Sequence, residues 1–445
     1  MTKASDTQFR AGASGLRVPL LEFEVYGHFG VPCGLRVSAD NTVKMLRAKS
    51  NAFRLHCVSE ASEEQRVEGG ALARRSQIVN LFHVNPVTLL ALMRTPHHEP
   101  FRFLSRMNVC VPFWELPHVP DFWIPILRGM DLVLAPTQFI ADAIQASDPS
   151  IRVRHFPQTV FIPENVAPQR ERFGFPNGVT VFGTSFAAQA VAERKNPWAV
   201  IEAFHAAFPS EPNVRLVVRA YDAGGADASP FLRSLVELAK GDPRIVVMSE
   251  RLDYDEVMGL YASYDVFVSL HRSEGLGLGP MEAMSVGTPV IGTGWSGNMD
   301  FMTAENSCLV AYTLVPVCVD PSSPYGTEIM REDEVWAEPD VEDAARYMRV
   351  LHADPTLRAG LGIKAKSDMS SRHAEIIKGA FVDELGTLAS DIGSHRRAHF
   401  ARAFSLSVIS LRQQRDYWTN KFRRAVVAAL RTLHLKPPAP EGEAR

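Results

Sequence analysis

The chain has 445 residues, more than one ordinary domain core holds, since domains usually run roughly 100 to 200 residues. It is 46% hydrophobic and 22% charged with a net charge of -3, a composition that excludes an overall attraction to nucleic acid. Its five cysteines are scattered, with no CxxC pair and no cluster at metal-ligand spacing, so we expect reduced thiols in a cytoplasmic protein. The polar N-terminus and the lack of a long apolar run predict neither a signal peptide nor a membrane span.

Short apolar runs alternate with longer helix-like segments, which favours an α/β architecture with parallel sheets. Strands are predicted in the first half at 18–27, 53–59, 77–84, 107–115 and 132–137. Helices are predicted between them at 35–50, 86–94 and 138–146. A stretch with Pro, Gly, Asn and charged residues at 161–178 is typical of a linker between domains.

A second alternating series follows the linker. Its strands are predicted at 179–185, 214–220, 244–250, 266–271 and 289–294, and its helices at 196–208, 229–239, 253–263 and 280–286. Two parallel-sheet domains would face each other across a cleft, where the ends of the strands bind ligands. We predict a first domain at 1–170, a second at 171–395, and basic amphipathic C-terminal helices with a disordered end at 396–445.

The string SEGLGLGPMEAMSVG at 273–287 carries two glutamates separated by alternating glycines. It follows a predicted strand, and Pro280 and Gly287 are typical of the first residue of a helix and of the residue after its end. This assignment places Glu282 in the first turn. Backbone N–H groups in a glycine loop approach a ligand closely, and a helix start attracts anions, so a diphosphate fits here.

A carboxylate beside an anion is repelled unless it accepts hydrogen bonds from neutral hydroxyl groups, such as those of a sugar or ribose. Glu274 and Glu282 therefore indicate two hydroxylated rings on either side of a diphosphate, which describes a nucleotide sugar. The alternative is a glycine-rich turn in which Glu282 only caps its helix. The second glutamate and the change from strand to helix favour the binding site.

The same string resembles the E-x7-E signature of retaining glycosyltransferases with the GT-B fold, in particular glycosyltransferase family 4. Three further segments agree: WELPHVPDFW at 114–123, ERKNPWAVIEAFHAAF at 193–208 and YASYDVFVSLHRSEG at 261–275. The resemblance extends over most of residues 20–350. It implies two Rossmann-like domains facing a cleft, the first on the acceptor side and the second binding the nucleotide sugar.

The resemblance implies a role for each site residue of the second domain. Glu274 lies near the hydroxyls of the donor sugar, and Glu282 contacts the ribose. Arg194 and Lys195 neutralise the diphosphate as the glycosidic bond breaks, although such a dipeptide is often only a solvated surface pair. The phosphate and sugar are held by the backbone amides of Gly275, Leu276, Gly277, Leu278 and Gly279.

Two weaker donor-side candidates lie on strands of the second domain. Gly183 belongs to the first of these strands, and it is followed by Thr184 where many relatives have Arg. Arg219 closes the strand VRLVVRA, where a basic residue can also be only an exposed strand end. Both residues are predicted to bind the donor.

The first domain supplies candidates on the side of the acceptor or donor sugar. Gly30 and Gly34 follow the first strand, where the family has a glycine-rich loop. His83 ends a strand, and a purely structural histidine is an equal alternative. Glu115 follows another strand beside Trp114, whose ring either stacks on a sugar or packs in the core.

No metal site and no cofactor are predicted. Asp253-x-Asp255 resembles the metal-binding DxD motif of the other large glycosyltransferase fold, but Asp253 with Glu256 is better explained as a capping box. No carboxylate stands out as a nucleophile, although retention normally suggests one. The resemblance implies instead a same-face displacement in which the departing diphosphate helps to deprotonate the acceptor.

The last fifty residues are strongly basic. Within them, four apolar residues recur at helical spacing and would form one face of a helix: Val426, Val427, Leu430 and Leu433. The other face would carry Arg423, Arg424 and Arg431. A basic amphipathic helix indicates peripheral contact with an anionic membrane. The alternative is a helix that crosses back to brace the first domain. The segment PPAPEGEAR at the end is expected to be disordered.

These features predict a retaining, metal-independent hexosyltransferase that uses a nucleotide-diphosphate sugar, with mannosyl among the candidate groups. Its acceptor would be a glycan or a lipid-linked hydroxyl in polysaccharide biosynthesis for the cell envelope. We expect it in the cytoplasm, with the inner face of the plasma membrane as a candidate site of action. Two alternatives stay open: a GT-B sugar-nucleotide epimerase and a catalytically idle module that binds sugar nucleotides.

Overall fold

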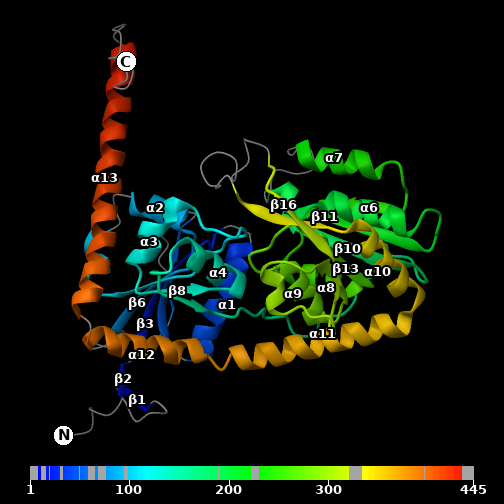
Figure 1. Cartoon of the computed structure of the whole chain (residues 1–445), viewed down its shortest axis with the longest axis horizontal. Helices are drawn as coiled ribbons and strands as arrows, with labels where there is room; N and C mark the ends of the chain where they lie inside the picture. The colour runs from blue at the N-terminus through cyan, green and yellow to red at the C-terminus, as the bar shows by residue number, and fades with distance from the viewer. Residues whose placement is uncertain are drawn as a thin grey trace.

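The computed structural model describes residues 9–11, 17–19, 21–30, 34–49, 51–58, 66–68, 77–94, 99–187, 191–221, 230–319, 333–394 and 396–432. They form two α/β domains side by side, one built from the first part of the chain and one from the second (Figure 1). The α/β class predicted from the alternating pattern is confirmed.

The first domain contains a seven-stranded sheet in the order β5-β4-β3-β6-β7-β8-β9, parallel except at β5. Its strands are β3 (Leu21–Gly27), β4 (Ala52–Cys57), β5 (Arg66–Glu68), β6 (Gln77–Phe82), β7 (Met107–Cys110), β8 (Leu132–Ala135) and β9 (Val153–His155). The helices are α1 (Gly34–Ala48), α2 (Pro86–Met93), α3 (Ile124–Gly129) and α4 (Gln138–Ser147). All predicted strands and helices of this half are confirmed, although β7 ends five residues earlier than expected. A small hairpin of β1 (Phe9–Ala11) and β2 (Arg17–Pro19) precedes the sheet.

The second domain contains a six-stranded parallel sheet in the order β12-β11-β10-β13-β14-β15. Its strands are β10 (Thr180–Ala187), β11 (Val214–Tyr221), β12 (Ile245–Met248), β13 (Val266–Ser269), β14 (Val290–Thr293) and β15 (Cys308–Val310). Its predicted helices are found as α6 (Pro197–Ala207), α7 (Pro230–Ala239), α8 (Tyr254–Ser263) and α9 (Leu278–Val286). An antiparallel pair of β16 (Tyr312–Pro316) and β17 (Val335–Pro339) was not predicted.

The two domains share apolar packing at α9. Met281, Ala283 and Met284 of this helix belong to the same buried cluster as Trp114 and Leu116 of the first domain. Burial of apolar surface from both domains stabilises their contact, because each side chain is removed from water. The start of this helix also lies close to the first domain, since a Cβ atom on Gly34 would be 3.4 Å from Leu278 Cδ1.

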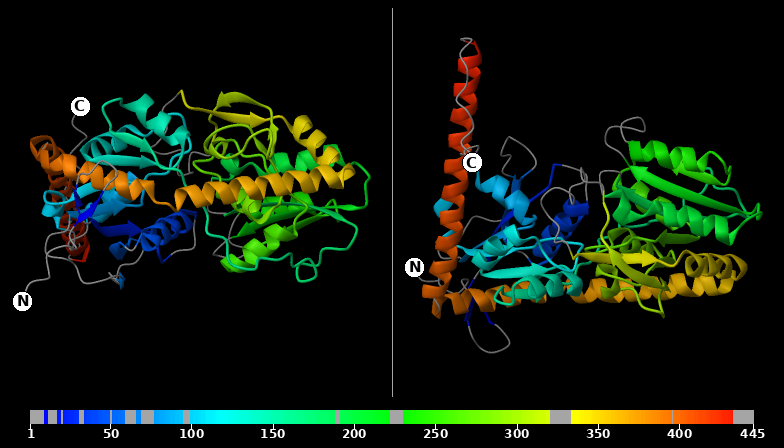
Figure 2. Two further views of the ribbon diagram at one scale, coloured as in Figure 1. Left: turned by 90° about the horizontal axis from the view of Figure 1, so that it is seen from below. Right: turned by 45° about the horizontal axis from the view of Figure 1, so that its top comes forward.

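The chain crosses between the domains twice. The first crossing is the irregular segment 161–178, as predicted for the linker. The second follows α10 (Val341–Ala353) and uses α11 (Pro355–Ile376) and α12 (Ala380–Ser394), which run along one side of both domains (Figures 1 and 2). Phe381 of α12 packs on Phe156 of the first domain, with ring centroids 4.8 Å apart.

The last helix, α13 (Arg396–Thr432), turns away from α12 and runs along α2 and α3 before extending past them (Figure 1). Its first half is anchored by buried Asp131, whose Oδ1 lies 2.9 Å from His399 Nδ1 and accepts from Arg402 Nη2 at 2.8 Å. Ala403 and Leu406 are buried beside these contacts. The alternative that this segment braces the first domain is thus confirmed for the first half of α13.

The far half of α13 is described only in part. The side chains of Arg423, Arg424, Val426, Val427, Leu430 and Arg431 lie outside the described part of the structure, as do Leu433 and the whole segment 433–445. In the part of the chain that the structure describes, no helix is long and apolar enough to span a membrane.

Candidate functional site

The glycine loop at 273–279 connects β13 to α9, as the sequence predicts. The helix, however, begins at Leu278 rather than Pro280, with Gly277 as its N-cap at φ 85°. Glu282 is therefore the fifth residue of α9, so its predicted place in the first turn is wrong. The reason is that Gly277 adopts a left-handed conformation, which starts the helix two residues earlier. Gly287 ends the helix at φ 94°, as predicted.

The main chain of the loop is closely packed. A Cβ atom on Gly275 would lie 3.0 Å from the carbonyl oxygen of Trp114, and one on Gly277 would lie 3.1 Å from Asn298 Cβ. In the described part of the chain, the N–H groups from Gly275 to Gly279 donate no hydrogen bond. Together with the start of α9, they form a group of backbone donors suited to an anion.

The carboxylate of Glu274 is enclosed by two cations. Lys195 Nζ donates to Glu274 Oε1, and Arg194 Nη1 donates to Glu274 Oε2 at 3.1 Å. Arg194 and Lys195 end the short helix α5 (Ala192–Lys195), just before Pro197 starts α6. The structure therefore brings the three predicted catalytic residues into one cluster.

Opposing effects act on the ionisation of this cluster. Burial disfavours the charged form of Glu274, yet the charges of Lys195, Arg194 and His271 and the bond from Lys195 lower its pKa to about 2. Burial lowers the pKa of Lys195, against the pull of Glu274. We conclude that Glu274 is ionised at neutral pH and keeps the cations beside it.

Ser296 and Gly297 clamp the main chain of Glu274. The N–H of Glu274 donates to Ser296 Oγ at 2.8 Å, and its carbonyl oxygen accepts from Gly297 N–H at 2.9 Å. Ser296 adopts φ 75° and ψ -148°, a conformation suited to glycine that costs other residues roughly 1–3 kcal/mol. A strained residue at this place indicates that its hydroxyl is needed there.

The substitution Ser296→Gly removes both the strain and the hydroxyl. We expect the melting temperature to stay level or rise, because the relieved strain exceeds one lost hydrogen bond of roughly 0.5–1.5 kcal/mol. Turnover should fall, because Glu274 loses one of its two main-chain restraints. Thermal unfolding and steady-state kinetics on one preparation measure both effects, and unchanged kcat would show that the clamp is only structural.

Glu282 is buried within the second domain, beside Tyr254 of α8 and Arg219 of β11. Burial raises its pKa to about 8, with Tyr254 and the charge of Arg219 acting in the opposite direction. From the sequence we expect this group to be a carboxylate that only accepts hydrogen bonds. The structure predicts instead a neutral carboxyl group at pH 7, which can donate one hydrogen bond and accept others.

The raised pKa of Glu282 has a consequence for stability. In the folded chain the carboxyl group of Glu282 keeps its proton up to about pH 8, whereas in the unfolded chain it releases the proton above about pH 4.5. The stabilisation that comes from this proton is therefore complete at low pH and is lost as the pH rises to about 8. Glu282→Gln removes this dependence. We expect the melting temperature of the variant, relative to wild type, to increase from about pH 5 to about pH 9. Parallel melting curves across that range would contradict the assignment.

The structure places Arg219 beside Glu282, whereas Gly183 is explained by packing against an aromatic ring. Arg219 is buried beside Glu282, and its Nη1 donates to Ser185 Oγ at 3.1 Å, so it is not an exposed strand end. Gly183 lies in the middle of β10, where a Cβ atom would come within 2.2 Å of the Tyr264 ring. Packing against Tyr264 explains this glycine without a donor contact. The strand β10 also continues to Ala187, two residues beyond its predicted end.

The predicted site residues of the first domain include His83, Gly30 and Gly34. His83 is fully buried, and burial lowers its pKa to about 4, so its ring is neutral. Its Nε2 lies 3.4 Å from Ser38 Oγ, and its Nδ1 has no hydrogen-bond partner among the described residues. A Cβ atom on Gly34 would lie 3.4 Å from Leu278, so the starts of α1 and α9 face each other, whereas Gly30 is exposed.

Glu115 and Trp114 lie where the first domain meets the glycine loop. Glu115 Oε1 lies 3.7 Å from Arg194 Nη2, and its carbonyl oxygen accepts from Ser273 Oγ. Trp114 is buried, with its ring 5.1 Å from that of Trp123, so the core-packing interpretation is confirmed. Thr137 Oγ1 donates to Gly275 O at 2.9 Å from the same side.

Sequence reasoning did not find His271, Ser296 or Asn298. His271 is buried beside Glu274, with its Nδ1 3.0 Å from Ser269 Oγ and its Nε2 3.0 Å from Asn298 Oδ1. Their signal in the sequence is only that they follow β13 and β14 directly. The carboxyl ends of adjacent parallel strands meet at one edge of the sheet, which brings these loops together.

The rejected metal motif forms a capping box. The N–H of Glu256 donates to Asp253 Oδ1 at 2.9 Å, and the N–H of Asp253 donates to Glu256 Oε2 at 2.8 Å, as predicted. No group of three or more His, Cys, Asp or Glu suited to a metal occurs within the described ranges. The prediction that the reaction needs no metal stays a prediction.

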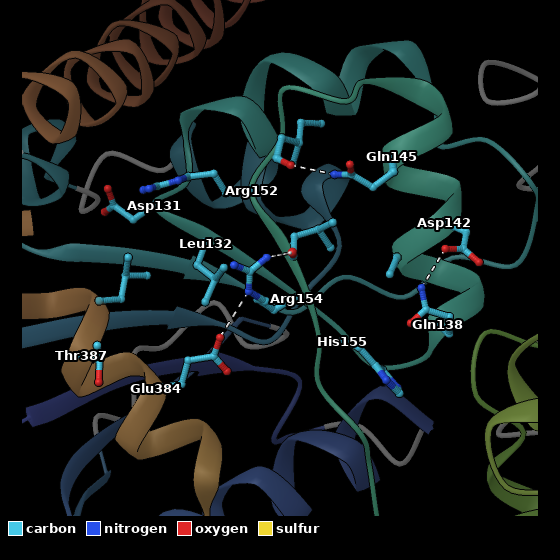
Figure 3. Close-up of a pocket in the computed structure, with 14 residues that line it drawn as sticks. Asp131, Leu132, Gln138, Asp142, Gln145, Arg152, Arg154, His155, Glu384 and Thr387 are labelled. Atoms are coloured by element: carbon cyan, nitrogen blue, oxygen red, sulfur yellow. Dashed lines mark hydrogen bonds and ion pairs between the residues drawn. The ribbon is translucent and has the colours of Figure 1, made fainter. Parts of the chain in front are cut away.

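A pocket of about 610 Å³ lies in the first domain between β8, β9, α4 and α12 (Figure 3). It is lined by Gln138, Arg154 and Glu384 among others, and it contains none of the predicted site residues. Arg154 and Glu384 form an exposed ion pair across it, with Nε and Oε1 3.4 Å apart. It is separate from the cluster around Glu274.

Comparison with solved structures shows the fold. Sucrose-phosphate synthase from Thermosynechococcus elongatus superposes with a TM-score of 0.57 at 14% identity, covering 86% of this chain and 99% of that one. The trehalose-6-phosphate enzyme of E. coli bound with UDP-2-fluoro glucose gives a TM-score of 0.57 at 12% identity, covering 82% and 99%. The chain has the GT-B fold.

Comparisons of sequence agree with this fold. Residues 183–316 match the family model described as Glycosyl transferases group 1, a range that includes Arg194, Glu274 and Glu282. Alpha-monoglucosyldiacylglycerol synthase of Streptococcus pneumoniae (strain ATCC BAA-255 / R6) is 26% identical over 179 residues. That alignment spans 38% of this chain and 38% of the relative.

Proposed function

We propose that this GT-B protein is a retaining glycosyltransferase of family 4 that moves a hexosyl group from a nucleotide-diphosphate sugar to a glycan or lipid-linked hydroxyl. The observation that carries the proposal is the cluster of Arg194, Lys195 and Glu274 beside the free N–H groups of the glycine loop. Cations and backbone donors at one place suit a diphosphate leaving group. Mannosyl is one candidate for the transferred group.

In this proposal each charged group has one task. Lys195 and Arg194 stabilise the negative charge that develops on the diphosphate as its bond to the sugar breaks. Glu274, ionised and fixed through its main chain by Ser296, orients both cations and accepts hydrogen bonds from the donor sugar. Its two oxygens already bind cations, so we assign it no nucleophilic role.

The remaining predicted residues position the substrates. Glu282, with Arg219 nearby, would bind the ribose, and the amides of Gly275–Gly279 would hold the phosphates. His83, neutral and with Nδ1 unpartnered within the described chain, is placed to bind the donor sugar or the acceptor. The departing diphosphate would help to deprotonate the acceptor hydroxyl, and no metal is required.

Two other functions share this site. A sugar-nucleotide epimerase would convert the donor without an acceptor, and an idle module would bind it without turnover. The relative in Streptococcus pneumoniae is named as a synthase of a glucosyl diacylglycerol, which favours transfer to a lipid acceptor. We place its action in the cell envelope, at the cytoplasmic face of the plasma membrane, as part of this proposal.

Incubation of the purified chain with labelled UDP- and GDP-sugars, with and without a cell-envelope lipid fraction, tests the proposal. Release of nucleotide and transfer of label only with the lipid fraction is the expected result. Isomerised donor would support the epimerase, and binding without turnover would support the idle module. Product anomeric configuration, determined by nuclear magnetic resonance, decides between retention and inversion.

A further inference from the structure

The described side chains of α13 expose an apolar stripe on a face turned roughly 90° away from the side that packs on the first domain. Its members share high exposure and a spacing of four or seven residues: Phe400 at 54%, Phe404 at 50%, Leu411 at 43% and Trp418 at 49%. At 100° per residue these positions lie within roughly 40° of one another, along about 27 Å of helix. The stripe therefore forms one continuous strip of apolar surface.

This stripe is not needed for the contact with the first domain. That contact uses other positions of the same helix, among them Ala403, Leu406 and Ser410, which are buried. Among the described helices and strands, none lies beside the half of α13 beyond α2 in the views of Figures 1 and 2. Four large apolar side chains facing water raise the free energy of the chain, and a partner surface would remove that cost.

The charge of α13 decides which partner fits. The helix carries nine Lys or Arg residues and one acidic residue, Asp416. Exposed Arg397, Arg412 and Arg415 border one side of the stripe, and Lys421 Nζ lies 5.0 Å from the centre of the Trp418 ring. Two such helices facing each other would repel, so an equivalent helix of a second copy is disfavoured. An anionic surface with an apolar interior would bind both the apolar stripe and the basic side chains of α13.

We propose that α13 lies on the surface of a bilayer containing anionic lipids, with the stripe inserted between headgroups. Each Lys or Arg near such a surface contributes roughly 1 kcal/mol, and Trp and Phe suit the boundary between headgroups and acyl chains. The net charge of the whole chain is -3, so the parts outside α13 are acidic in sum and are repelled by the same surface. The contact is thereby confined to α13 and orients the first domain toward the lipid.

Sedimentation of the full-length protein with vesicles tests this proposal. We compare phosphatidylcholine vesicles with vesicles containing about one-third phosphatidylglycerol. Wild type should bind the anionic vesicles much more tightly, and Leu411→Ser/Trp418→Ser should lower that affinity roughly 10- to 100-fold, as expected from the apolar area removed. The control Ile363→Ser alters an apolar residue of α11 that is even more exposed, at 73%, and should bind like wild type.

A charge variant completes the design. Arg412→Glu/Arg415→Glu should reduce binding to anionic vesicles to the level seen with phosphatidylcholine alone. Equal binding of wild type to both vesicles would overturn the proposal. So would a concentration-dependent dimer, measured by sedimentation equilibrium without lipid, that the Leu411→Ser/Trp418→Ser variant abolishes. Binding is measured without a sugar donor, so it is independent of the proposed function.

Discussion

Lys195→Met is expected to lower kcat by about 10²- to 10³-fold while changing the KM for the donor only slightly. The ammonium group contributes most when charge develops on the leaving diphosphate, so its removal affects the transition state more than donor binding. Methionine keeps the apolar part of the side chain. Arg194 stays within 3.1 Å of Glu274 and still neutralises it, so the fold should tolerate the change.

The matched control for this variant is Lys240→Met. Lys240 is an exposed lysine that pairs with Glu237 one helical turn away, far from any predicted site residue. Its kcat should equal that of wild type. A Lys195→Met protein with wild-type kcat would show that the leaving group is stabilised by Arg194 and the loop amides alone. A lower melting temperature in proportion to the lost activity would show that the effect is structural, so both are measured on one sample.

Glu282→Ala is expected to weaken donor affinity by roughly 10- to 100-fold, because two hydrogen bonds to ribose hydroxyls are worth about 1–3 kcal/mol together. The chemical step should change little, since the groups that act on Glu282 are Tyr254 and Arg219 rather than Lys195 and Arg194. The expected signature is therefore a raised donor KM with nearly constant kcat, the opposite of that for Lys195→Met.

Two further variants separate binding from folding in this experiment. Glu282→Gln keeps the size of the side chain and both kinds of hydrogen-bonding group, so it should lose less affinity than Glu282→Ala. Glu237→Ala changes an exposed glutamate and should leave the affinity unaltered. Calorimetric titration with the nucleotide diphosphate measures the effect without turnover. Equal affinity of wild type and Glu282→Ala would remove Glu282 from the donor site.

Local patterns in the sequence determined the two sheets and most of their helices. Alternation of apolar runs with helical segments predicted five strands in each domain, because buried parallel strands need nearly continuous apolar residues. Short elements were missed: β9 and β15 have three residues each, too few for a pattern to repeat. The segments β16 and β17 pair across residues 320–332, a separation that no local signal bridges.

The sequence alone also placed Glu274, Arg194 and Lys195 among the site residues, through their positions after strands and their resemblance to a known signature. Only the tertiary structure decided how they interact, since the ion pair of Lys195 with Glu274 joins positions 79 residues apart. Only the tertiary structure likewise decided that Glu282 is neutral, because its raised pKa is caused by burial, and the spacing of residues in the sequence does not show burial.

For the C-terminal helix α13, too, the sequence determined some features and the tertiary structure decided others. Its charge and helical spacing could be read directly from the residues, and they indicated both a membrane contact and a brace. The choice of the bracing face depended on Asp131, which lies 268 residues before His399 in the chain. A buried carboxylate selects its partners by distance in space, so only the folded chain could show which face of α13 packs against the first domain and which face stays exposed.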